Sequence, residues 1–198
     1  MPNLQHYLNM CVDPKFGEYA INNEIIVTPF WKPEFCAGLV EYCQNNRHLF
    51  DVDPSYKTEE LNLTLFDMAL FEDFKYHYSE FLIPFVRKFW HLDNTIQGIV
   101  SPYIIRYTQT SLRKDIDLHV DQSVFTIYIK LNSDYGEGTL KFPRQNWSSA
   151  DVPVGHMIIW PSMLTHPHYA DKITTGEKYS LVGHNYTFEL APNRKFKF

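Results

Sequence analysis

The residues with the clearest chemical potential lie at 117–121, where the chain runs Asp-Leu-His-Val-Asp. Side chains of an extended segment alternate between two faces, so His119 and Asp121 are expected to point the same way. This places an imidazole beside a carboxylate and turns Val120 into the core. The pattern is weak by itself, because ordinary hydrogen-bonded pairs produce it often.

Two further histidines follow an apolar segment that ends at Trp160. They are His166 and His168, and the only basic side chain ten positions after one of them is Lys178. A second imidazole that met His119 and Asp121 would complete a set of two histidines and one carboxylate. This set leaves coordination positions open and is diagnostic of non-haem Fe(II) oxygenases. His166 and His168 have the same strand parity, so alternation alone does not choose between them.

Helices are expected in the first half of the chain. Pro33 suits a first helical turn, and an apolar face follows, which predicts a helix over about 34–46 with Cys36 and Cys43 in the core. Apolar residues at three- and four-residue steps, Phe81 among them, predict a second helical region over about 65–90, kinked or divided at Pro84. A short strand is expected at 25–27, an irregular lead-in at 1–24 and a surface loop at 51–60.

After Gly98 the pattern changes from helical to β. Short segments rich in β-branched and aromatic residues, separated by Gly, Pro, Asn and Asp, are expected as strands at 99–107, 124–131, 138–142, 156–160 and 179–188. Several short strands at this spacing are typical of a sandwich, jelly roll or barrel.

Composition narrows the class of protein. The chain has 198 residues and a formal net charge of −5, and it lacks the clustered basic residues that nucleic-acid binding needs. The three cysteines, Cys11, Cys36 and Cys43, cannot all pair and form no C-x-x-C motif, which favours a reducing compartment and a cytoplasmic location. No signal peptide or membrane-spanning segment is expected.

The ordered motifs over about 99–188 resemble the prolyl 4-hydroxylase-like branch of the 2-oxoglutarate and Fe(II)-dependent dioxygenases. The matching residues are Tyr107, His119-Val-Asp121, Leu131-Asn132, the turn at 136–142, Gly155 before an apolar strand, Trp160-Pro161-Ser162, a distal histidine and Gly176-Glu-Lys178-Tyr-Ser180-Leu. The resemblance implies an α+β, mainly β fold. It predicts a single domain over 1–198, with a double-stranded β-helix (jelly-roll) core at about 96–190 and supporting helices at about 25–95.

The resemblance also implies a ligand set. Fe(II) would be held by His119, Asp121 and His168, because the preceding proline and the basic residue ten positions later match the family pattern better at His168 than at His166. His166 would then lie behind the site, face the substrate or be a solvated loop residue.

The cosubstrate 2-oxoglutarate is assigned its own residues by the same resemblance. Lys178 would pair with the far carboxylate, Ser180 on the same strand face could help to hold it, and Tyr107 would contact the cosubstrate. Lys130 departs from the family, which often has an aromatic residue there, and it would add charge to the pocket or point outward. The segment 108–117 is slightly long and bears on substrate choice.

The expected activity is hydroxylation of an unactivated C–H bond with O2 and 2-oxoglutarate, with release of succinate and CO2 and with ascorbate as an optional cofactor. A prolyl residue in a peptide or protein is the first expected substrate. The alternatives are a free amino acid or other small molecule, a non-catalytic metal-binding jelly-roll protein, or a β-rich interaction module in which the His-x-Asp motif is incidental. Neither a nucleic-acid partner nor a membrane is expected.

Overall fold

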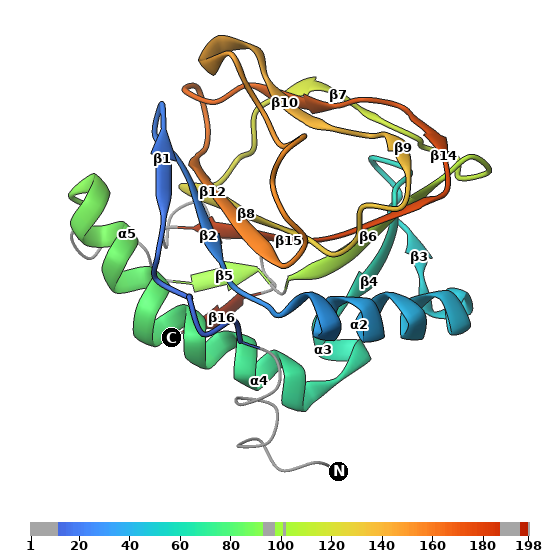
Figure 1. Cartoon of the computed structure of the whole chain (residues 1–198), viewed down its shortest axis with the longest axis horizontal. Coiled ribbons are helices and arrows are strands. Elements are labelled where there is room, and N and C mark those ends of the chain that lie inside the picture. Colours follow the sequence, from blue (N-terminus) through green and yellow to red (C-terminus); the bar gives the residue numbers. More distant parts are fainter. Residues whose placement is uncertain (1–11, 93–97, 101, 187–194, 198) are drawn as a thin grey trace.

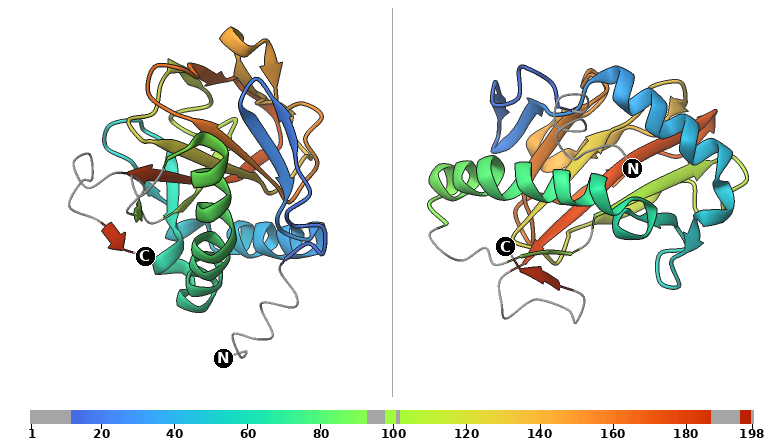
Figure 2. Two further views of the ribbon diagram at one scale, coloured as in Figure 1. Left: turned by 90° about the vertical axis from the view of Figure 1, so that its left-hand side faces the viewer. Right: turned by 90° about the horizontal axis from the view of Figure 1, so that it is seen from below.

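The structure, a computed structural model, describes residues 12–92, 98–100, 102–186 and 195–197. Most of its regular structure is antiparallel β, with few helices. Figures 1 and 2 show a layered arrangement in which the helices lie on one side of a large sheet and a smaller sheet lies on the other. The mainly β fold class predicted from the sequence is thus confirmed at this level.

The large sheet has the strand order β1-β2-β12-β8-β15-β6-β4-β3, and β5 and β16 extend it beside β15. Every pairing in it is antiparallel. The strands are β1 (Ala20–Asn22), β2 (Ile25–Pro29), β3 (Asp51–Val52), β4 (Glu59–Asn62), β5 (Gly98–Val100), β6 (Tyr103–Thr108), β8 (Phe125–Lys130), β12 (His156–Pro161), β15 (Glu177–Tyr186) and β16 (Lys195–Lys197). Strands far apart in sequence therefore become neighbours.

The smaller sheet has the order β11-β10-β13-β7, and a separate two-stranded pair is formed by β14 and β9. These strands are β7 (Ile116–His119), β9 (Gly136–Glu137), β10 (Leu140–Phe142), β11 (Trp147–Ser148), β13 (His168–Ala170) and β14 (Ile173–Thr175). The antiparallel register of β13 on β7 sets His168 directly opposite His119. Residues that are directly opposite project to the same face of a sheet, so the two imidazoles face one another.

The helices begin and end at clear local signals. Helix α2 (Pro33–Asn45) has proline in its first turn, and α4 (Met68–His77) is capped by Asp67, whose Oδ1 accepts the backbone N–H groups of Ala69 and Leu70. The short α3 (Leu63–Phe66) precedes α4. A π-helical turn (Tyr78–Leu82) joins α4 to α5 (Ile83–Trp90), whose first turn holds Pro84. The predicted interruption at Pro84 is confirmed, because proline has no N–H to continue the ladder.

One apolar core joins the helices to the large sheet. Its buried members come from α2, α4, α5 and strands β2, β6, β8, β12 and β15. Cys36 and Cys43 are both fully buried in it, as predicted. Cys11 lies outside the described residues. The helices therefore form the support on which the sheet rests.

Some local predictions are wrong. The lead-in contains β1, which pairs with β2, and the ends of the expected 51–60 loop are β3 and β4. Val120 is not turned into the core: it is 36% exposed and lines a cavity, because β7 is an edge strand that ends at His119. Phe81 is 51% exposed, because the π-helical turn shifts the apolar stripe relative to the core.

No helix in the described part of the chain has both the length and the apolar character needed to cross a membrane.

Candidate metal and cosubstrate site

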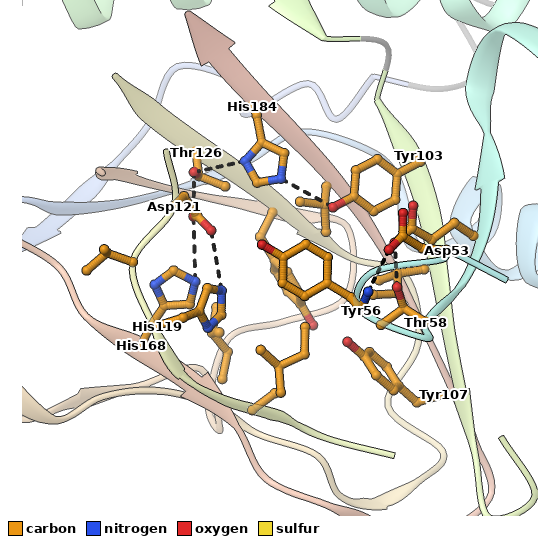
Figure 3. A pocket seen from close by; sticks show the side chains of 18 of the residues that line it. Asp53, Tyr56, Thr58, Tyr103, Tyr107, His119, Asp121, Thr126, His168 and His184 are labelled. Atoms are coloured by element: carbon orange, nitrogen blue, oxygen red, sulfur yellow. Dashed lines mark hydrogen bonds and ion pairs between the residues drawn. The ribbon is translucent and has the colours of Figure 1, made fainter. Parts of the chain in front are cut away.

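His119, Asp121 and His168 converge at one point. Each offers a ligand atom, and these three atoms lie within 4.8 Å of one another. The Nε2 atom of His119 lies 3.4 Å from Asp121 Oδ1, and the Nε2 atom of His168 lies 3.6 Å from Asp121 Oδ2. Figure 3 shows both imidazoles pointing toward the same carboxylate. The register of β7 and β13 supplies the histidines, and Asp121 follows just beyond the end of β7.

The outer nitrogens of the two imidazoles are held by backbone carbonyls. Nδ1 of His119 donates to the carbonyl oxygen of Asp117 at 2.7 Å, and Nδ1 of His168 donates to that of His166 at 3.0 Å. This assignment of the tautomers leaves the Nε2 lone pairs free on the side of Asp121. Such contacts fix the ring orientation of metal-binding histidines.

Asp121 is 9% exposed and stays ionised. Burial acts to raise its pKa, but the hydrogen bond with His119, the neighbouring imidazoles and the hydrogen bond from Thr126 together lower the pKa well below its usual range. The Thr126 hydroxyl donates to Asp121 Oδ2 at 2.6 Å. Burial lowers the pKa of His168, so this imidazole is neutral and able to act as a ligand. The set thus contains an ionised carboxylate at Asp121 and a neutral imidazole at His168.

A cavity of about 410 Å³ opens beside these three side chains. Lys178 on β15 lines it and is 2% exposed, and its ammonium donates to the carbonyl oxygen of Gly138 at 2.6 Å. Its Nζ atom also lies 5.5 Å from the ring centre of Tyr107 and 5.7 Å from that of Tyr128. Burial is the main cause that lowers the pKa of Lys178 to about 8, and nearby Lys130 contributes to this lowering. The ammonium of Lys178 therefore faces the cavity without an ion-pair partner within the described residues.

Tyr107 lines the same cavity from β6, where its backbone is directly opposite Lys178. It is 3% exposed, and its hydroxyl has no hydrogen-bond partner within the described residues. An unpartnered buried hydroxyl is costly, so this group is poised for a ligand. The structure thus brings Lys178 and Tyr107 together at one end of the cavity.

Ser180, Lys130 and His166 lie around the cavity without lining it. The Ser180 hydroxyl donates to the Tyr128 hydroxyl at 2.7 Å, so Ser180 positions a residue of the cavity wall. Lys130 is buried and donates to the carbonyl oxygen of Val152 at 2.9 Å, which excludes the outward orientation. His166 is 1% exposed and its Nε2 donates to the carbonyl oxygen of Asn23 at 3.0 Å, so its imidazole points away from the cluster and is not solvated.

Several cavity residues were missed by the sequence analysis. His184 lies on β15 with the same parity as Lys178, and its Nδ1 and Nε2 atoms lie 3.4 Å from the Thr126 hydroxyl and 3.2 Å from the Tyr103 hydroxyl. Strand parity could have identified it. Four more come from the segment expected to be a surface loop, which carries no such signal: Asp53, Tyr56, Thr58 and Glu60.

The donor set and the cavity fit Fe(II) and 2-oxoglutarate. Two imidazoles and one carboxylate suit Fe(II) and leave positions free for a chelating ligand. The buried ammonium of Lys178 and the unpartnered hydroxyl of Tyr107 are the groups that a second, anionic end of that ligand needs. The residues present therefore fit Fe(II) and 2-oxoglutarate, the cofactor and cosubstrate predicted from the sequence.

The known proteins that are similar to this chain include hydroxylases. No protein-family model matches the chain. It is 26% identical over 181 residues to a procollagen lysyl hydroxylase and glycosyltransferase of Acanthamoeba polyphaga mimivirus, an alignment that covers 84% of the chain and 20% of the relative. The chain thus spans about a fifth of the length of this curated relative.

Solved structures share the fold. One is the viral collagen prolyl hydroxylase of Paramecium bursaria Chlorella virus-1 in complex with 2-oxoglutarate, with a TM-score of 0.59, 13% identity and coverage of 85% of this chain and 95% of that one. Another is a prolyl hydroxylase of Trichoplax adhaerens in complex with a hypoxia-inducible-factor peptide, with a TM-score of 0.62, 15% identity and coverage of 94% and 92%.

The shared fold, the His–Asp–His cluster and the sequence match agree with one another, and the predicted resemblance to the prolyl 4-hydroxylase-like branch of the class of 2-oxoglutarate and Fe(II)-dependent dioxygenases is confirmed. Within that class the chain is similar in fold to prolyl hydroxylases and in sequence to a procollagen lysyl hydroxylase.

Proposed function

We propose that the chain is a 2-oxoglutarate and Fe(II)-dependent dioxygenase that hydroxylates an unactivated C–H bond in a residue of a peptide or protein. The observation that carries this proposal is the convergence of His119, Asp121 and His168 beside a cavity that also holds the buried ammonium of Lys178. When bound, Fe(II) supplies the oxidising chemistry: O2 and 2-oxoglutarate are consumed, one oxygen atom enters the substrate, and succinate and CO2 leave.

The chain's own residues have separate tasks in this reaction. His119, Asp121 and His168 hold the metal ion, and the Thr126 hydroxyl fixes the orientation of the Asp121 carboxylate. Lys178 and Tyr107 bind the far carboxylate of 2-oxoglutarate, and Ser180 keeps Tyr128 in place against Lys178. The buried wall of the cavity excludes water around these polar groups, which strengthens their electrostatic interactions.

Architecture supports the same proposal. We infer that the large sheet and the smaller sheet form a double-stranded β-helix, within one domain over 1–198. The β-helix core would lie at about 96–190 and the helical support at about 25–95. The triad would then sit at the open end of the β-helix. A cytoplasmic location stays a prediction from the cysteine pattern.

A prolyl residue is the substrate expected from the sequence, and the fold shared with prolyl hydroxylases supports it. A lysyl residue is the second candidate. It is favoured by the sequence match to a procollagen lysyl hydroxylase and by carboxylates in the cavity.

The direct test measures succinate formed from 2-oxoglutarate, with Fe(II) and O2, in the presence of prolyl peptides, lysyl peptides or no peptide. We expect slow succinate formation without peptide, faster formation with the correct peptide, and a mass increase of one oxygen atom on that peptide. The control is His168→Ala, which removes a proposed metal ligand and should lose all three signals. Wild-type protein that forms no succinate under any of these conditions would contradict the proposal.

A further inference from the structure

The wall of the cavity that lies opposite His119, Asp121 and His168 is acidic and aromatic. It is built by β4, β6 and the loop that joins β3 to β4, and it contains Asp53, Tyr56, Glu60, Tyr103 and Tyr107. Figure 3 shows Tyr56 pointing from this loop into the cavity, with Tyr103 and Tyr107 on the same side. None of these residues has a task in holding the metal ion.

Strand geometry explains why Glu60 faces the cavity and Glu59 does not. Glu60 lies directly opposite Ile105 on β6, and Ile105 shares its face with Tyr103 and Tyr107. Glu59 projects to the other face, where Arg106 forms an ion pair with it. Of these two adjacent carboxylates on β4, Glu59 is therefore paired with Arg106, whereas Glu60 faces the cavity.

The carboxylate of Glu60 has no cationic partner among the described residues. Its Oε1 atom accepts a hydrogen bond from the Thr58 hydroxyl at 2.5 Å, and burial is the main effect that raises its pKa. Asp53 lies in the same wall, and its Oδ1 accepts the backbone N–H groups of Ser55 and Tyr56 at 2.8 and 2.6 Å. These bonds fix the carboxylate but leave its charge unmatched.

This arrangement sets the net charge of a cavity that holds both Fe(II) and 2-oxoglutarate. The two charges of Fe(II) would offset those of 2-oxoglutarate, and Lys178 would offset Asp121. Asp53 and Glu60 would then remain as uncompensated negative charges beside three tyrosine rings. Partly buried carboxylates and aromatic faces are the groups that bind an alkylammonium ion in proteins.

We propose that Glu60, assisted by Asp53 and the tyrosine rings, binds the ammonium group of a lysyl side chain in the peptide substrate. This inference rests on the function proposed above and goes further, because it assigns the residue that selects the substrate. It favours a lysine-containing peptide over a neutral prolyl peptide. The lysine is either the residue that becomes hydroxylated or its immediate neighbour, and both place an ammonium group against the same carboxylate.

The first experiment measures binding to protein loaded with Mn(II) and 2-oxoglutarate without oxygen. Fluorescein-labelled neutral peptides carry one central lysine, norleucine, N-acetyl-lysine or proline, and fluorescence anisotropy gives their dissociation constants. We expect the lysine peptide to bind roughly tenfold more tightly than the other three, with the difference shrinking as salt is added.

Glu60→Gln should reduce the tenfold preference to about twofold or less, since it removes the charge and keeps the size. The matched control is Glu59→Gln, which makes the same change one residue away on the opposite face and should keep the preference. Glu60→Asp retains the charge and should recover part of it. Should Glu60→Gln fail to fold, the comparison of Glu60→Asp and Glu60→Lys still decides, because only the first should favour lysine over norleucine.

The second experiment locates the oxygen atom. Peptides with a lysine alone, or with a proline before or after the lysine, are incubated with wild-type enzyme, and fragmentation by mass spectrometry finds the modified residue. Oxygen on the lysine or on the proline beside it supports the proposal and identifies which arrangement holds. Equal turnover of the lysine and norleucine peptides would overturn it, as would an equal loss of preference in Glu59→Gln. Succinate formation without peptide tests the proposed function independently of either result.

Discussion

The charged side chains of the cavity differ in how they are neutralised. Asp121 is surrounded by imidazoles and a hydroxyl donor, whereas the buried ammonium of Lys178 contacts a carbonyl oxygen and two aromatic rings and forms no ion pair within the described residues. A buried ammonium without a carboxylate partner is costly, because desolvation favours its neutral form. Such a group is explained by a ligand that carries the missing negative charge.

The binding of 2-oxoglutarate is therefore expected to depend on the protonation of Lys178. The pKa of Lys178 in the free protein is lowered to about 8, so the ammonium is present below pH 8 and is lost as the pH rises through that value. The dianionic ligand prefers the ammonium form. Its dissociation constant should be nearly constant from pH 6.5 to 7.5 and should then rise, by up to about tenfold per pH unit above pH 8.

The measurement is a titration of the Mn(II)-loaded protein with 2-oxoglutarate by calorimetry at several pH values. Lys178→Arg is the control, because a guanidinium stays charged throughout this range. Its affinity should be independent of pH between 7 and 9, even if it is weaker overall. The same rise in dissociation constant for wild type and Lys178→Arg would show that another group titrates.

Individual residues of the site could be predicted only where particular residue types stand at a diagnostic spacing. The positions 119, 121 and 178 combine rare chemistry with strand parity, and the structure brings these side chains to one cavity. Asp53 and Glu60 carry no such spacing, and acidic residues are common in exposed segments. They reach the cavity only because β4 pairs with β6, a contact between segments more than forty residues apart that local sequence patterns do not reveal.

At the scale of secondary-structure elements, the pairing of β2 with β12 joins the first strands of the chain to the middle of the large sheet. Gly155 lies immediately before β12, and its carbonyl oxygen accepts the backbone N–H groups of Phe30 and Trp31. It has φ +82°, and a Cβ atom at this position would lie 2.0 Å from the carbonyl oxygen of Trp31. Both the backbone conformation and the close approach therefore require glycine.

Gly155→Ala should destabilise the protein strongly, by more than about 3 kcal/mol, because neither the left-handed backbone nor the contact with Trp31 can relax cheaply. Gly38→Ala is the matched control. Gly38 is exposed in α2 with no atom near an added Cβ, so alanine there should stabilise the helix by roughly 0.5–1 kcal/mol. Urea unfolding followed by circular dichroism measures both changes. Equal stability of the two variants would contradict this account.

Elements were predicted best where they are long and periodic. The helix predicted at 34–46 is α2, and the strands predicted at 124–131 and 156–160 are β8 and β12, each within one or two residues. Strands of two or three residues, such as β9, β11 and β13, were missed as elements. Their conformation is imposed by pairing with neighbours rather than by their own sequence.

At the scale of the whole molecule, the His–Asp–His cluster and the cavity beside it are formed by segments that meet only in the folded chain. His119 and His168 belong to the smaller sheet, while Lys178 and Tyr107 belong to the large one. The cavity lies between these groups and contacts both sheets. Ligands that bridge the cavity bind the folded state and have no comparable site in the unfolded chain, so they should stabilise the whole fold.

We therefore expect Mn(II) and 2-oxoglutarate together to raise the midpoint of thermal unfolding. At concentrations a hundred times the dissociation constant, one ligand adds about 2.7 kcal/mol, which corresponds to a shift of roughly 5–10 °C for a chain of this size. Differential scanning calorimetry without oxygen measures the shift, and each ligand alone should give less than the pair, because the metal ion and the far end of the cavity bind the same molecule.

His168→Ala and His166→Gln separate the two histidines that the sequence could not distinguish by parity. His168→Ala should lose most of the shift, because it removes an atom of the converging set. His166→Gln can still donate a hydrogen bond to the Asn23 carbonyl, and its backbone carbonyl still orients His168. Its unfolding temperature without ligands can differ from wild type, but the shift on adding ligands should stay. Loss of the shift in His166→Gln with retention in His168→Ala would place the metal at the other histidine.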